Sequence, residues 1–307
     1  MREYLRKLVG GLLALPLLTL SSFAHAEVAI VTTTTDLAAI AREVGGDLVS
    51  VKSLAPGTRD AHHLAAKPSM KLAARDADLV LAVGADLEIG WLPLVLDGSR
   101  NWAVQPGAAG FLDLSTAVTL LDIPSGPVDR SMGDVHALGN PHYWLDPRNG
   151  IAMGHAIAQR LGVLDPGNAA RYREQAEAFA KRVDEQLSEW RDTLGPLRGR
   201  KMISYHRSFP YLAAAFGFDI VGEVEPIPGV DPTARHLREL VDRVQAEKIA
   251  MLIMEPFYEQ ESAAFLQRST DIAVAVIPAS VGGLPGIETY TDLFDQIVSI
   301  ISNAASG

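Results

Sequence analysis

Residues 168–194 read NAARYREQAEAFAKRVDEQLSEWRDTL, a stretch without glycine or proline. Its large apolar residues recur at intervals of three or four: Tyr172, Ala176, Phe179, Val183, Leu187, Trp190 and Leu194. This spacing predicts one amphipathic helix with a single continuous apolar stripe. At ~1.5 Å per residue such a helix would extend on the order of 40 Å, which is long enough to cross a molecule made of two lobes.

Strand and helix patterns alternate on both sides of this stretch. Before it, we expect strands at 28–31, 49–54, 79–83 and around 102–104, with helices over 36–44, 70–77, 90–96 and 147–161. After it, we expect strands at 201–205, 218–221, 249–254 and 272–277, with helices over 209–216, 231–247, 259–268 and 289–302. Such alternation is typical of parallel sheets covered by helices on both faces.

The pattern therefore predicts an α/β protein of two lobes. Each lobe has a mostly parallel sheet flanked by helices, and one long backbone helix joins the two. We place the N-terminal lobe at residues 27–165, the linking helix at 166–195 and the C-terminal lobe at 196–307.

Residues 1–26 have the features of a cleavable signal peptide. Arg2, Arg6 and Lys7 precede an apolar run over 8–20, and Ala24-His25-Ala26 supplies the small residues that a signal peptidase requires. The run is short for a membrane anchor, the alternative interpretation. We therefore expect cleavage before Glu27 and a periplasmic mature protein.

Composition excludes several classes of function. The chain of 307 residues has 27 Lys and Arg against 37 Asp and Glu, a net charge of −10, which gives it no general attraction for nucleic acid. It has no cysteine, which rules out disulfides, thiolate metal sites and a lipid-anchored cysteine. No Walker A sequence occurs, so we expect no ATP site in this chain.

Three of the eight histidines occupy the same kind of position in the predicted fold. His62 lies in the loop after the 49–54 strand, His142 stands shortly before the 147–161 helix, and His206 ends the 201–205 strand. Ligands of open parallel sheets bind at the carboxyl ends of strands, and imidazole is a common zinc ligand. Position alone leaves two interpretations open: a metal site between the lobes, or three separate surface or capping histidines.

Three motifs extend this observation. They are Gly57 to Ser69 (GTRDAHHLAAKPS), Pro141 to Pro147 (PHYWLDP) and Ser204 to Tyr211 (SYHRSFPY). With them the chain resembles the periplasmic metal-binding receptors of ABC-type zinc and manganese importers, in the group with a rigid helix between the lobes. The resemblance covers essentially the whole mature chain, and it departs from the usual pattern at Ala61, where proline is common.

The resemblance implies the chemistry of the site. His62, His142 and His206 would be metal ligands, with a fourth ligand two residues before the tyrosine that opens the last helix, which is Glu288 here. Asp292 or a water molecule are the alternatives for that position. Three imidazoles and one carboxylate suit Zn²⁺ better than Mn²⁺, which favours harder oxygen ligands.

The implied function is a high-affinity periplasmic Zn²⁺ receptor that delivers the ion to an ABC importer and is not an enzyme. Its expected partner is the membrane permease, with a periplasmic metallochaperone as a second candidate, and we expect a monomer. One alternative is a manganese receptor of the same family. The other is a zinc hydrolase, with Glu255 as its base.

The remaining polar residues receive other interpretations. His136, in the 122–139 segment rich in glycine, proline and aspartate, is either a weak metal-collecting group or part of an ordinary mobile loop. Asp60 and Asp146 are candidates to orient ligands or to cap helices. The other histidines that remain after cleavage, which are His63, His155 and His236, are expected to be structural.

Overall fold

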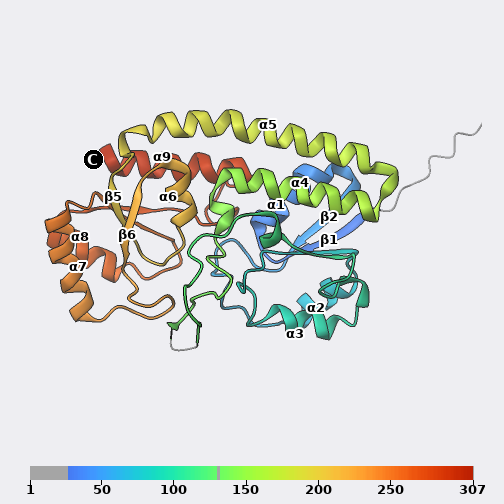
Figure 1. The fold of residues 1–307 in the computed structure, drawn as a ribbon, viewed down its shortest axis with the longest axis horizontal. Helices are drawn as coiled ribbons and strands as arrows, with labels where there is room; N and C mark the ends of the chain where they lie inside the picture. Colours follow the sequence, from blue (N-terminus) through green and yellow to red (C-terminus); the bar gives the residue numbers. More distant parts are fainter. Residues whose placement is uncertain (1–26, 130–131, 307) are drawn as a thin grey trace, which may run out of the picture.

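The computed structural model describes residues 27–129 and 132–306, so the predicted signal peptide lies outside the described residues. Two lobes lie side by side, and one long helix runs along both of them (Figure 1). Each lobe contains a sheet of four parallel strands. The predicted fold class is confirmed, whereas the exact domain boundaries stay a prediction.

The N-terminal sheet has the strand order β2-β1-β3-β4. Its strands are β1 (Val28–Thr32), β2 (Val49–Ser53), β3 (Leu79–Ala82) and β4 (Phe111–Asp113). Its helices are α1 (Thr35–Gly45), α2 (Pro68–Arg75), α3 (Leu92–Ser99) and α4 (Pro147–Leu164). Alternate residues of β3 belong to different cores: Leu79 and Leu81 pack with α1 and α4, whereas Val80 and Ala82 pack with α2 and α3. Helices therefore cover both faces of this sheet.

The C-terminal sheet repeats the arrangement with the order β6-β5-β7-β8. Its strands are β5 (Lys201–Ser204), β6 (Asp219–Glu223), β7 (Met251–Met254) and β8 (Ala273–Val276). Its helices are α6 (Pro210–Phe216), α7 (Ala234–Glu247), α8 (Glu261–Thr270) and α9 (Tyr290–Ser306). One face of β7 packs with α7 and α8, and its other face joins the large core that continues into the N-terminal lobe.

The helix α5 (Ala169–Thr193) fastens both lobes, and its whole apolar stripe is buried. On the N-terminal side, Arg182 pairs with Glu43 of α1. On the C-terminal side, the Trp190 Nε1 donates to the Asp295 Oδ1 of α9 at 2.7 Å. In Figure 1, α9 lies beneath one half of α5 and α4 beneath the other. The helix is therefore a shared scaffold rather than a free linker.

Helices α3, α4 and α9 end three or four residues later than predicted, and two further differences have a local cause. The strand expected around 102–104 is wrong: these residues form a short 3-10 turn, and the fourth strand is β4 instead. The side chain of Asn101 accepts the Ala103 N–H at 3.1 Å, which favours the turn. The helix expected from 231 begins at Ala234, because the Thr233 hydroxyl accepts the His236 N–H at 3.2 Å and caps it.

Loops at the carboxyl ends of the strands come together between the lobes. The segments that follow β2, β5, β7 and β8 all line one small cavity, so residues far apart in the sequence share it. Within the described part of the chain, no helix is long and apolar enough to cross a membrane.

Candidate metal centre

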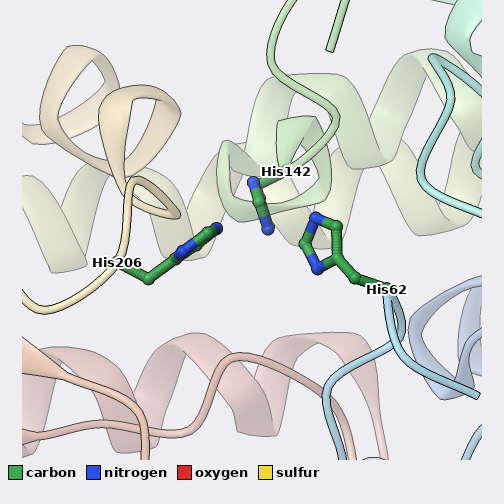
Figure 2. Close-up of side chains that lie close together, drawn as sticks. All are labelled: His62, His142 and His206. Carbon is green, nitrogen blue, oxygen red and sulfur yellow. The ribbon is translucent and has the colours of Figure 1, made fainter. Parts of the chain in front are cut away.

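His62, His142 and His206 meet between the lobes. Figure 2 shows the three rings pointing toward a common space from three separate segments. One ring nitrogen from each lies within 4.8 Å of the others, and the ring centroids are 5.1 to 5.5 Å apart. Their side chains are almost completely buried, at 6% exposure for His62 and 3% for His206. Among the described residues, these three form the one group with metal-ligand geometry.

Each of the three rings holds its Nδ1 against an oxygen. The pairs are His62 with Asp60 Oδ1 at 2.6 Å, His142 with Asn140 Oδ1 at 3.0 Å, and His206 with Glu225 Oε2 at 2.7 Å. An oxygen acceptor keeps the proton on Nδ1, so the Nε2 atom carries the free lone pair. The three hydrogen bonds therefore orient three Nε2 lone pairs that could bind one metal ion.

Two of the histidines are oriented by the same local turn. The Oδ1 of Asp60 also accepts the backbone N–H of His62 at 2.8 Å, and the Oδ1 of Asn140 accepts that of His142 at 3.0 Å. In both cases an Asx side chain two residues before the histidine binds its backbone and its ring. The sequence interpretation identified Asp60 but missed Asn140, which the repeated Asx-x-His spacing could have revealed.

The third histidine depends on a distant carboxylate. Glu225 follows β6 closely, is buried with His206, and also accepts the backbone N–H of Gly229 at 2.8 Å. Burial, the largest single effect, lowers the pKa of His206. The hydrogen bond to Glu225 and the charges of Glu255 and Glu225 together outweigh it, so the pKa lies above its ordinary value. Burial, followed by the neighbouring histidines, holds the pKa of His142 well below its ordinary value.

The described residues of the 122–139 loop, 122–129 and 132–139, cover the outer side of the histidines. A hollow of about 530 Å³ lies under the loop, and His136, His142 and His206 are part of its wall. The loop is held across the cleft because the Asp134 N–H donates to the Pro228 carbonyl at 2.9 Å. The loop therefore forms a cover over the three rings.

His136 reaches from this loop to the histidines. Its Nε2 is 3.1 Å from the Nε2 of His62, and burial, followed by the charges of His62 and His206, lowers its pKa to about 3. Two nitrogen ligands of one tetrahedral zinc ion lie about 3.3 Å apart when each Zn–N bond is ~2.0 Å. With the proton of His62 on Nδ1, the contact is a hydrogen bond that His136 Nε2 donates, so in the metal-free site His136 covers the lone pair of His62 that an ion would take.

The structure places Glu288 and Asp292 outside the group of three histidines. Glu288 is exposed and borders a separate hollow with Arg42 and Glu43. Asp292 caps the start of α9, because its Oδ2 accepts the N–H groups of Glu288 at 3.1 Å and Thr289 at 2.8 Å. Asp146 caps α4 as predicted, by accepting the Arg148 N–H at 2.9 Å.

A different carboxylate lines the cavity of the histidines. Glu255 directly follows β7 and is 1% exposed, and burial raises its pKa to about 7. Its Oε1 accepts a hydrogen bond from the Ser208 hydroxyl, and its Oε2 has no hydrogen-bond partner among the described residues. Three free imidazole lone pairs beside a buried carboxylate make an arrangement suited to a divalent cation.

The chain is similar to known metal-binding proteins over most of its length. The family model described as ZnuA, zinc-uptake complex component A periplasmic, matches residues 30–304. The high-affinity zinc uptake system protein ZnuA of Paracoccus denitrificans (strain Pd 1222) is 26% identical, over 88% of this chain and 90% of the relative. The iron-binding protein YfeA of Yersinia pestis is 25% identical, over 89% of this chain and 85% of the relative.

A solved structure supports the same fold. A crystal structure of ZnuA superposes with a TM-score of 0.75 and 24% identity, covering 91% of this chain and 99% of the other. The family consists of metal-binding receptors of ABC importers rather than enzymes, which removes the zinc hydrolase from consideration. Because the family model matches nearly all of the described residues, the chain belongs to the ZnuA family of periplasmic zinc-uptake components.

Proposed function

We propose that this chain is a periplasmic receptor that binds Zn²⁺ through His62, His142 and His206 and delivers it to the permease of an ABC importer. The observation that supports it most is the shared orientation of the three rings. Each Nδ1 contacts an oxygen, and one nitrogen of each ring lies within 4.8 Å of the other two. Such preparation of lone pairs is what a metal site needs and a set of capping histidines does not.

The donor set favours zinc over manganese and iron. Three imidazole nitrogens are borderline donors that suit Zn²⁺, whereas Mn²⁺ prefers carboxylate and water oxygens. At equal geometry, Zn²⁺ also binds a nitrogen site more tightly than Mn²⁺ or Fe²⁺. The manganese receptor remains the alternative, and competition between the metals decides between them.

Binding requires only a small contraction of the site. Ligand nitrogens around a tetrahedral zinc ion lie about 3.3 Å apart, so a group whose members lie within 4.8 Å must close by up to about 1.5 Å. The helix α5 is fastened to both lobes, which resists a large rotation of one lobe against the other. We expect the loops that carry the histidines, together with the 122–139 cover, to make this adjustment.

The remaining parts of the proposal concern export and partners. Residues 1–26 act as a signal peptide that is cleaved before Glu27, and the mature chain works as a monomer. The loaded receptor docks on the permease, and it takes the ion either from solution or from a metallochaperone.

Metal binding to the chelator-stripped mature chain tests this proposal. We expect one zinc per chain, tighter binding of zinc than of manganese or iron, and loss of binding in His142→Ala. His155→Ala is the matched control, because this ring lies half exposed on α4 and should leave binding unchanged. Absence of bound metal, or full binding in His142→Ala, would contradict the proposed site.

A further inference from the structure

Glu255 is a buried carboxylate that the three-histidine site does not explain. It stands at the carboxyl end of β7, next to β5, the strand that leads into His206. It is 1% exposed, and it carries a negative charge whenever it is ionised. A carboxylate removed from water in this way normally has all its oxygens satisfied, because an unpartnered one is costly.

One oxygen of Glu255 has its partner and the other does not. The Ser208 hydroxyl donates to Oε1, whereas Oε2 is buried without a hydrogen-bond partner among the described residues. Ser208 lies two residues after His206, so the same short loop holds the ligand and fixes the carboxylate. The carboxylate of Glu255 is therefore held in place by the loop that carries His206.

The cavity next to Glu255 is the one that the three histidines line. Its volume is about 30 Å³, and its wall includes His62, His142, His206 and Glu255. This is room for about one or two water-sized groups. Glu255 does not belong to the set whose ligand atoms all lie within 4.8 Å, so a bridging molecule fits better between it and the ion.

The other carboxylate in this cavity wall is already engaged. Asp60 uses its Oδ1 for both the backbone and the ring of His62. Neutral imidazoles carry no charge to offset that of a divalent cation, and the carboxylates of Asp60 and Glu225 lie on the Nδ1 sides of their rings, so taking the ion out of water remains costly. An additional negative charge inside the cavity lowers that cost, and Glu255 is placed to supply it.

We propose that Glu255 is the anionic partner of the bound cation: a water molecule fills the fourth coordination position and donates a hydrogen bond to Glu255 Oε2. This inference rests on the proposed metal-receptor function. It gives the orphaned oxygen its donor when the ion is bound. It also assigns the carboxylate role, which the sequence motif placed at Glu288, to a residue that the fold brings to the histidines.

Two substitutions separate the charge of Glu255 from its shape. Glu255→Gln keeps the size and removes the charge, whereas Glu255→Asp keeps the charge and shortens the side chain. If the charge matters, zinc affinity should fall at least about tenfold in Glu255→Gln and less in Glu255→Asp. If the residue only fills space and binds Ser208, the order should be reversed, and that result would overturn the inference.

The metal-free proteins provide a second readout. Glu255→Gln removes a buried carboxylate with an unpartnered oxygen, so its melting temperature without metal should equal or exceed that of the wild type. Glu259→Gln, an exposed neighbour on the same segment, is the control and should change neither property. Should Glu255→Gln fail to fold, the pair Glu255→Asp and Glu255→Asn carries the test, because the two side chains have the same size and only Asp keeps the charge. Zinc should bind more tightly to Glu255→Asp, and equal affinities would refute the inference.

Competition against a chelator at one pH measures all variants together with His142→Ala. No metal binding by the wild type would overturn both the proposed function and this inference. Wild-type binding that is lost in His142→Ala but unchanged in Glu255→Gln would leave the receptor function intact and remove Glu255 from it.

Discussion

At the scale of single residues, orientation of the histidines distinguishes this site from a chance cluster. The same Asx turn holds His62 and His142, so each ring is fixed by its own neighbour two residues earlier. The turn itself is local, and Asn140 is also held by the other lobe, because its Nδ2 donates to the Arg207 carbonyl at 2.8 Å. Substitution of the Asx residue is therefore the smallest change expected to disturb the orientation of a histidine ring while keeping the histidine itself.

Replacement of Asn140 tests that device. Asn140→Ala removes the oxygen at Nδ1 of His142, so the ring loses its fixed tautomer and direction. We expect zinc affinity to fall by about 10- to 100-fold in chelator competition. Asn303→Ala, on the exposed end of α9, should bind as the wild type does. Unchanged affinity in Asn140→Ala would mean that packing alone orients the ring.

The raised pKa of His206 predicts a pH dependence of binding. Below this pKa the ring is protonated and has no lone pair for zinc, so affinity should fall as the pH drops through a value above about 6.5. Glu225→Gln keeps an oxygen for the His206 Nδ1–H but removes the negative charge that helps to raise the pKa, and the decline should then begin at a lower pH. A pH series of competition measurements checks both curves, and coincident midpoints would contradict the assignment.

The residues differ in how far the sequence could predict them. The three histidines could be identified because each stands in a short motif at a strand end or before a helix. Glu225 could not, because its contact with His206 depends on the pairing of β5 with β6. The motif led to Glu288 for the fourth position, but the segment before α9 directs that side chain outward.

At the scale of elements, α1 contributes a buried carboxyl group to the contact between the lobes. Asp36 is fully buried, and its Oδ1 accepts the N–H of Val281, which lies in the segment after β8, at 2.9 Å. Burial raises the pKa of Asp36 to about 7, whereas its hydrogen bonds, the first with Val281, lower it in part. The folded protein therefore binds a proton at Asp36 that the unfolded chain releases near pH 4.

The sign of this shift gives a stability prediction. Because the folded pKa is raised, stability decreases as the pH rises from about 4 to about 7. Asp36→Asn cannot ionise and keeps an oxygen for Val281, so it should stabilise the metal-free protein at pH 8 by on the order of 4 kcal/mol. Near pH 3.5 the difference should be small. Urea unfolding at both values checks this, and equal differences would contradict it.

Secondary structure could be predicted best where one pattern dominated. The stripe of α5 and the alternating strands follow from hydrophobic spacing alone. The failures occur where a side chain binds the backbone locally, as Asn101 does in the turn that replaced a predicted strand and Thr233 does at the start of α7. Such caps depend on one hydrogen bond, which hydrophobic spacing does not report.

At the scale of the whole molecule, the lobes are joined by a common core rather than by a hinge. Phe179 of α5 packs against Tyr290, and Trp190 packs against Phe294, with ring centroids 6.0 and 5.2 Å apart. All four residues belong to the core cluster that runs through the two lobes. The two lobes are therefore held together before metal arrives, and only the loops that carry the histidines need to adjust.

This shared core predicts cooperative unfolding. Phe179→Ala should cost about 3–5 kcal/mol, because it leaves a cavity where a fully buried ring was. The loss should appear as one transition at a lower temperature, since both lobes depend on the same cluster. Calorimetry of the metal-free protein measures it. Two separated transitions would show that the lobes unfold independently.

The most direct test of the account is an anomalous difference map, measured at the zinc edge, from crystals of the zinc-loaded mature protein. The account predicts one strong peak among the Nε2 atoms of His62, His142 and His206, with a water molecule between the ion and Glu255. A peak elsewhere on the molecule, or no peak in protein that retains all three histidines, would contradict it.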